Sequence, residues 1–105
     1  MLEKILTAAA LPHRAGRYAD PPATTYAITF DDVGASGPDG YNMILQHDCM
    51  VELYELQPDD AAEAAMEAAL NARGLPWTKQ ARYWLKDIKR YQVVYEVTYI
   101  EKRRD

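Results

Sequence analysis

The sequence predicts a small α+β domain, with a mainly antiparallel sheet and helices packed on one of its faces. Two segments, 41–54 and 91–101, alternate in the way that half-buried strands do. Between them, residues 58–73 carry apolar residues at helical spacing. The order helix, strands, helix, strands favours antiparallel pairing, and 105 residues form one domain, 1–105.

Residues 1–10 predict a short amphipathic helix. Leu2, Ile5 and Leu6 recur at helical spacing, and Pro12 ends the helix because the residue before a proline avoids the helical region. An isolated helix of this length is marginal in water. We therefore expect it to dock on the sheet or on a neighbouring molecule.

The next segment is predicted to be irregular until a first strand begins. Residues 12–25 are rich in proline and glycine, and residues 26–30 alternate as a strand. Asp31 and Asp32 are expected to end that strand. Residues 31–40 then form a long loop of the kind that often carries function or is disordered.

Residues 41–54 form the longest strand candidate. A straight run of this length extends roughly 40 Å, beyond the usual strand. We therefore expect a bulge, a bend or a projection beyond the main sheet. Alternation places one set of side chains together on one face: Met43, Leu45, His47, Cys49, Val51 and Leu53.

Residues 58–73 give the clearest helix signal. Pro58 suits the first helical position, and Gly74 is a natural C-cap. Small residues dominate the apolar stripe, so the helix can lie close to a sheet. The stripe consists of Ala62, Ala65, Met66, Ala69 and Leu70.

The C-terminal part predicts a closing pair of strands. Residues 77–86 and 91–101 are the strands, and residues 86–90 form the turn between them. The tail, 102–105, is expected to fray.

Charge is unevenly distributed along the chain. Residues 1–74 hold 12 acidic and 4 basic side chains, whereas residues 75–105 hold 4 acidic and 8 basic ones. The two regions could neutralise each other within one fold. Alternatively, the basic face of one subunit could meet the acidic face of another. The sequence leaves both interpretations open.

Cysteine use and hydropathy indicate the expected setting. Cys49 is the only cysteine, so no intramolecular disulfide can form. The N-terminus lacks the pattern of a signal peptide, and no apolar stretch approaches the length of a membrane span. The cytoplasm is the expected compartment.

The side chains that could support catalysis or metal binding are few. His47 and Cys49 share a strand face, but His13 is the only other histidine, and zinc needs three or four protein ligands. We expect Cys49 to pack as a small hydrophobe and His47 to lie near the sheet edge. Ser36, the only serine, has no nucleophile motif around it. We therefore predict no enzyme activity, no metal and no cofactor.

A cluster of bases and aromatic residues raises the possibility of nucleic-acid binding. The acidic pI of about 5.1 and the lack of a standard motif favour a solvated basic face instead. The bases are Lys79, Arg82, Lys86, Lys89 and Arg90.

Taken in order, several segments resemble the small tail-completion proteins of tailed bacteriophages and prophages, also called tail-terminator, neck or head–tail joining proteins. The resemblance covers nearly the whole chain, although the helix is richer in alanine and the tail more basic than in that family. The matching segments are Pro21-Pro22, Tyr26-Ala27-Ile28, the acidic glycine-containing stretch 31–40, Val51-Glu52-Leu53-Tyr54, the helix from Asp59 to Leu70, Gly74-Leu75-Pro76-Trp77-Thr78-Lys79 and Tyr91-Gln92-Val93-Val94-Tyr95-Glu96-Val97.

This resemblance implies a tail-terminator-like fold and a structural role at the top of the phage tail. Such proteins form homo-oligomeric rings, commonly hexameric, which cap the tail-tube protein and offer a docking surface to the head connector protein. DNA passes through the ring without being read. The expected location is the neck of a virion assembled in the bacterial cytoplasm. Beside the five bases, the expected contact residues are Asp31, Asp32, Gly34, Gly37, Asp39, Gly40 and Tyr41.

Two other functions remain open from the sequence. One is a small non-viral adaptor that binds a single soluble protein partner, which the charge segregation would suit. The other is a non-specific nucleic-acid-binding module that uses the five bases, with affinity that falls steeply as salt rises.

Overall fold

The computed structural model describes residues 1–36 and 42–104. The molecule is elongated, with extents of 48 × 27 × 22 Å. Its elements in chain order are α1 (Leu2–Ala8), β1 (His13–Ala15), β2 (Tyr26–Ser36), β3 (Asn42–Glu55), α2 (Asp60–Ala72), β4 (Trp77–Lys79), β5 (Tyr83–Leu85) and β6 (Arg90–Arg104).

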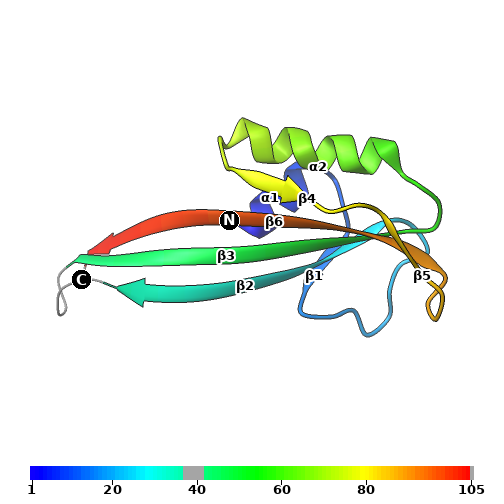
Figure 1. The fold of residues 1–105 in the computed structure, drawn as a ribbon, viewed down its shortest axis with the longest axis horizontal. Coiled ribbons are helices and arrows are strands. Elements are labelled where there is room, and N and C mark those ends of the chain that lie inside the picture. Colours follow the sequence, from blue (N-terminus) through cyan, green and yellow to red (C-terminus); the bar gives the residue numbers. More distant parts are fainter. Residues whose placement is uncertain (37–41, 105) are drawn as a thin grey trace.

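Six strands form a single sheet in the order β1-β2-β3-β6-β4, and β5 also pairs with β6. Strand β1 runs parallel to β2, whereas every other pair is antiparallel. The prediction of an α+β fold with a mainly antiparallel sheet is therefore confirmed. The two helices pack against each other and share one core with the sheet (Figure 1).

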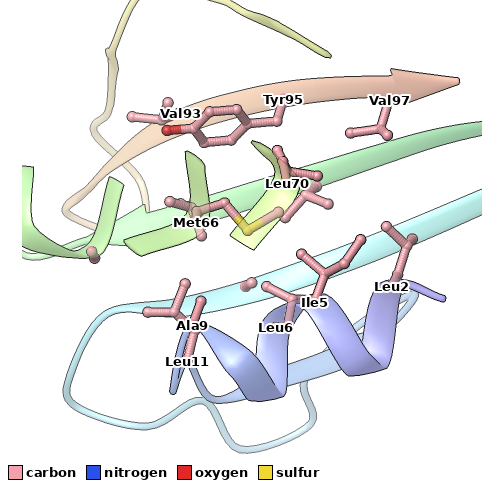
Figure 2. Packing of buried hydrophobic residues seen from close by; sticks show 14 of the residues in the cluster. Leu2, Ile5, Leu6, Ala9, Leu11, Met66, Leu70, Val93, Tyr95 and Val97 are labelled. Atoms are coloured by element: carbon pink, nitrogen blue, oxygen red, sulfur yellow. The ribbon is translucent and has the colours of Figure 1, made fainter. Parts of the chain in front are cut away.

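The core lies between the helices and one face of the three long strands (Figure 2). Strand β3 contributes Val51 and Leu53, which alternate with more exposed neighbours as the sequence predicted. Each large apolar side chain that is fully buried contributes roughly 1.5–3 kcal/mol to stability. The largest of these apolar side chains are Tyr95, Ile5, Leu6, Leu53, Met66 and Leu70.

Helix α1 is stabilised by packing, because it is too short to be stable alone. Leu2, Ile5 and Leu6 are buried in the core, so of the two docking surfaces considered the helix uses its own sheet. The helix ends before Pro12 is reached. Ala10 adopts a left-handed conformation (φ 58°), and the N–H of Leu11 donates to the carbonyl of Leu6 at 3.0 Å.

Helix α2 has a cap at each end. At the start, the carboxylate of Asp59 accepts a hydrogen bond from the backbone N–H of Ala62 at 3.0 Å. Pro58 therefore precedes the cap, and its predicted place as the first helical residue was wrong. At the end, Gly74 has a φ of 65°, and the N–H of Leu75 donates to the carbonyl of Leu70.

Strand β2 is much longer than predicted. It continues through Asp31 and Asp32 to Ser36, so the predicted loop over 31–40 was wrong for residues 31–36, and the rest of that loop lies outside the described residues. The strand continues because each residue from 26 to 36 has a partner on β3. Both aspartates can occupy positions in the strand, because Asp31 contacts His47 and Asp32 is exposed.

Two further boundaries differ from the prediction. Part of the segment expected to be irregular forms β1, which pairs with residues 27–29 of β2. The predicted strand 77–86 is split into β4 and β5. The N–H of Gln80 still bonds to the carbonyl of Val94, but the chain then leaves the ladder and Arg82 reaches glutamates of the core layer.

The tail was expected to fray from residue 102, but β6 extends to Arg104. Lys102 lies opposite Ile44 in the ladder, and Arg104 lies opposite Asn42. The last strand is therefore ordered by the first residues of β3. Strand β3 has neither the bulge nor the projection beyond the sheet that we considered, because it pairs in unbroken register with β6 over its whole length and with β2 over residues 44–54.

Gly74 offers a direct test of the α2 C-cap. Gly74→Ala should lower the free energy of unfolding by about 1 kcal/mol, because an alanine resists the left-handed conformation. A Cβ at this position would meet no atom within 4 Å, so the cost arises in the backbone alone. Urea unfolding measures the change.

Gly34→Ala is the matched control. Gly34 lies in β2, and a Cβ there also meets nothing within 4 Å. This variant should be neutral or slightly more stable than the wild type. Equal destabilisation by both substitutions would contradict the assignment of Gly74 as a left-handed cap.

Candidate interaction surface

The three long strands project beyond the helices and form a distal arm (Figure 1). We define the distal arm as residues 33–36 of β2, 42–47 of β3 and 99–104 of β6, which lie opposite one another in the ladder. The clustered core stops short of it, at Cys49 on β3 and Val97 on β6, with only Tyr99 packed against its end. The arm is therefore held mainly by strand pairing.

Both edges of the sheet are free along the arm. On one side, β1 covers only residues 27–29 of β2. On the other side, β4 and β5 cover only residues 95–97 and 90–92 of β6. In the part of the chain that the structure describes, no strand pairs with the outer edges of residues 30–36 or 98–104. Free edges of this kind can add a strand from another chain.

The arm also exposes apolar side chains. Val33 and Ile100 are 52% and 53% exposed, and Ile44 is 42% exposed. Strand alternation places Val33 on the face that the helices cover further along the sheet, and Ile44 and Ile100 on the opposite, open face. Apolar groups on both faces, beside free edges, suit a surface that other proteins bind.

At the base of the arm, His47 lies between two carboxylates. Its Nδ1 is 3.0 Å from both oxygens of Asp31 on β2, and its Nε2 is 2.9 Å from Oε1 of Glu101 on β6. The ring stacks on Tyr99 with centroids 4.3 Å apart. His47 lies on the central strand β3, so the expectation that it lies near the sheet edge was wrong.

The surroundings of His47 favour its charged form. Burial lowers the pKa of the imidazole, but the hydrogen bonds and the attraction from Asp31 and Glu101 outweigh this and raise the pKa above its ordinary value of 6.5. The ring contacts both neighbouring strands of β3, through Asp31 on β2 and Glu101 on β6. At its base the arm is thus held by these side-chain contacts as well as by the backbone.

A second ionic cluster joins α2 to the sheet. Glu55 at the end of β3 and Glu63 on α2 are both buried, and the guanidinium of Arg82 reaches them at 3.3 and 2.6 Å. The ammonium of Lys79 lies 2.7 Å from Glu63 and 2.8 Å from Glu67. The cluster therefore connects the β4–β5 segment, the helix and the central strand.

The two buried glutamates have opposite pKa shifts. Burial raises the pKa of Glu55 to about 7, and the nearby Glu63 adds to this. Lys79 and Arg82, together with Glu55, outweigh the effect of burial on Glu63 and hold the pKa of its carboxyl well below the usual range. Among the residues that the structure describes, oxygen Oε2 of Glu55 finds no hydrogen-bond partner. We therefore expect that removing a member of this cluster lowers the free energy of unfolding.

We expected Lys79 and Arg82 to contact another molecule, but both form ion pairs within the chain. Arg82 binds Glu55, Asp60 and Glu63, and Lys79 binds Glu63. Arg90 also has internal contacts, since its guanidinium donates to the carbonyls of residues 22 and 24. These three bases hold the fold together.

Lys86 and Lys89 differ from the other three predicted bases. Both are exposed, and neither forms an ion pair with the residues that the structure describes. They flank the predicted turn after β5, which the structure confirms over residues 86–89. They remain available to a partner.

The acidic candidates lie on opposite faces of β2. Asp31 points toward His47, whereas Asp32 lies on the open face, and Gly34 follows on the same side as Asp32. The structure thus separates Asp31 from the other contact candidates. The remaining candidates from the predicted loop lie outside the described residues: Gly37, Asp39, Gly40 and Tyr41.

Cys49 is buried beside Asp31, with its sulfur 3.5 Å from the carboxylate. Burial and the nearby carboxylate raise the pKa of the thiol to about 12, so the nucleophilic thiolate is disfavoured. In residues 1–36 and 42–104, no three His, Cys, Asp or Glu side chains are arranged to hold a metal.

Sequence reasoning missed the partners of three buried polar residues. His47 pairs with residues 16 and 54 positions away, Asp31 and Glu101. Glu55 and Glu63 share the guanidinium of Arg82, which lies 27 and 19 residues away in the sequence. A polar residue on the apolar face of a pattern, such as His47 on β3, is the signal that such partners exist.

Comparison with known proteins assigns no family, because neither a protein-family model nor a curated protein sequence matches this chain. None of the described helices has the length and apolar character needed to span a membrane. The arm, its free edges and the unpaired lysines therefore carry the argument about function.

The charged state of His47 can be tested by NMR titration of its ring. We expect a pKa above 6.5 in the folded protein. The folded state then binds this proton more tightly than the unfolded state, so the stabilisation is fully present below about pH 6.5 and is lost as pH rises through the folded pKa.

Neighbouring aspartates provide the control for this titration. Asp31→Asn should lower the pKa of His47, whereas Asp32→Asn, on the other face, should leave it nearly unchanged. A wild-type pKa at or below 6.5 would show that the two carboxylates do not hold a charged ring.

Removal of Arg82 tests the second cluster. Arg82→Ala leaves Glu55 without a cation, and we expect a loss of roughly 2–3 kcal/mol in urea unfolding, less than for a fully buried pair because Arg82 is partly exposed. Arg82→Ala combined with Glu55→Gln should recover part of the loss. Lys89→Ala, at an exposed site, should change stability by less than about 0.5 kcal/mol. Equal effects of Arg82→Ala and Lys89→Ala would contradict the role of the cluster.

Proposed function

We propose that this chain is a structural, non-catalytic subunit of a tail-completion ring in a tailed bacteriophage or prophage. In this role it caps the tail-tube protein and joins the tail to the head connector protein, while DNA passes through the ring. It would assemble in the bacterial cytoplasm and remain at the neck of the virion.

The distal arm is the observation that carries this proposal. Three strands of 11, 14 and 15 residues are long for a domain of this size, and they extend past the helices that bury their other end. An elongated sheet with free edges and exposed apolar groups offers contacts to more than one neighbour. A ring subunit needs such contacts with adjacent copies and with the tube.

The order of segments along the chain adds support, since it resembles that of tail-completion proteins over nearly the whole length. The structure agrees with the expected α+β class of that resemblance. The open face of the sheet also carries acidic side chains, such as Asp48 and Glu96. An acidic surface does not retain DNA, which suits a protein that DNA only passes.

The alternative of a nucleic-acid-binding module has less support than before. Lys79 and Arg82, which it needs, face glutamates of the same chain. Phosphate binding would have to compete with these internal contacts. The adaptor alternative predicts a monomer or dimer with one soluble partner, and the measurements below distinguish it.

The role of the arm can be tested with exposed apolar residues of equal exposure. Val33→Lys and Ile100→Lys place a charge on the arm, and we expect each to weaken binding to the phage's own tail-tube protein by at least roughly tenfold, because a charge buried in a contact is costly. Cosedimentation with assembled tubes measures this. Leu56→Lys is the control, since Leu56 is 53% exposed but lies outside the arm.

The wild-type protein sets the reference. Light scattering at several concentrations should detect a species of several copies, alone or when tubes are added. A protein that stays monomeric or dimeric, binds no tube and binds no head connector would refute the ring proposal. Binding to one unrelated soluble partner would then favour an adaptor.

A further inference from the structure

The open face of the sheet, opposite the helices, contains a groove with an apolar floor and an acidic rim. It crosses β2, β3 and β6 near the base of the arm and has a volume of about 540 Å³. Phe30 and Met50 are its large apolar lining residues, which we call the floor, and they are 41% and 36% exposed. The rim consists of Asp32, Asp48, Glu52 and Glu96. We call this feature the open-face groove.

The rim of the open-face groove has no cation of its own. Glu52 accepts from the hydroxyl of Tyr54, Glu96 from Gln80, and Asp48 from Gln46 and Thr98. Among the described residues, none of the four carboxylates forms an ion pair with a lysine or arginine. Four carboxylates around an apolar floor favour a ligand that is apolar at its centre and basic around it.

The same chain carries a surface with the opposite character. Strand β5 and the turn that follows, residues 83–89, form a tip at the end of the long axis away from the arm (Figure 1). Tyr83 is 65% exposed, and Trp84 and Ile88 are about half exposed. Lys86 and Lys89 lie beside them, so the segment 83–89 holds two bases and one acid, Asp87. We call residues 83–89 the basic tip.

Within one molecule the two surfaces do not meet. The basic tip pairs with the first residues of β6, at 90–92, whereas the open-face groove crosses β6 at Glu96 and Thr98 on one face of the sheet. The tip and the groove are thus two different patches of one chain. A contact between different patches is heterologous, and repeated copies of it close into a ring or extend as a filament.

We infer that the basic tip of one copy binds in the open-face groove of the next copy. The inference rests on the proposed function, in which copies of this chain assemble head to tail. Tyr and Trp are enriched at the centres of protein interfaces, and opposite charges around them set the register. The lysines at residues 86 and 89 would meet the rim carboxylates as the aromatic side chains cover Phe30 and Met50.

A second copy is favoured over other occupants because the complementary surface is present on the chain itself, at equal concentration. A nucleic acid is disfavoured, since phosphates would be repelled by the four carboxylates. A basic segment of another protein is the remaining occupant, and it predicts a different outcome in the experiment below.

Charge reversal tests the contact. Lys86→Glu/Lys89→Glu makes the tip acidic, and Asp32→Lys/Asp48→Lys/Glu96→Lys leaves Glu52 as the one rim carboxylate and makes the groove basic; all five positions are exposed. Each of these two variants alone should lose self-association by at least roughly tenfold, because like charges then meet. When mixed, the two variants should associate again, since each acidic tip meets a basic groove and each native tip meets a native groove. Light scattering measures the mass in every case.

The matched control is Lys4→Glu/Arg17→Glu, which makes the same change in net charge at exposed bases outside the tip. It should keep the mass of the wild type. Should a variant not fold, a second measurement uses Lys86→Cys chains mixed with Glu96→Cys chains, both with Cys49→Ala, and a short thiol cross-linker. Cross-linked pairs of one chain of each kind are expected.

The possible outcomes distinguish a failure of this contact from a failure of the proposed function. Loss in each variant with recovery on mixing supports the contact, even if the ring binds no tail tube. Wild-type mass in both variants overturns the contact while a tube-binding ring survives through other surfaces. Loss without recovery, together with no mixed cross-link, overturns it and points to a basic segment of another protein in the groove. A wild type that stays monomeric also overturns it.

Discussion

The structure depends on the uninterrupted pairing of β3 with both of its neighbours. All 14 residues of β3 have partners on β6, and 11 of them also have partners on β2. Because side chains alternate along a strand, this fixed register decides which side chains point toward the helices over the whole length of the sheet. The same register places the core residues and His47 on the face that the helices cover, and the open-face groove on the opposite face. A slip by one residue would exchange their faces.

The elements with strong local signals could be predicted from the sequence. The alternation from Leu45 to Leu53 and the stripe from Ala62 to Leu70 identify a half-buried strand and an amphipathic helix, because each pattern reflects burial of one face. The left-handed glycine after α2 was also predictable, since Gly74 follows the last apolar residue of the stripe. These features depend on neighbours a few residues away in the chain.

The features that were missed depend on partners far away in the chain. Asp31 and Asp32 are typical turn residues, yet the strand continues through them because β3 supplies hydrogen bonds and His47 supplies a charge. Arg82 belongs to a basic, aromatic stretch, and nothing near it in sequence indicates that it binds Glu55, 27 residues earlier. Three of the five bases predicted to contact a partner bind within the chain instead, and the distribution of charge along the sequence does not tell which bases have such internal contacts.

The short strand β1 has a consequence for how the free edge of β2 can be used. It occupies only residues 27–29, so a strand arriving from another molecule finds its first vacant position at Phe30. On the far edge, β5 and β4 pair with residues 90–92 and 95–97 of β6, so in the described part of the chain no strand pairs with this edge from Thr98 onward. At each edge, the short strands thus limit the number of residues that can pair with a strand from another molecule. A strand from another molecule can pair with a few residues of the arm but not with the whole length of the sheet. This limits open-ended strand addition and still permits a short intermolecular pairing.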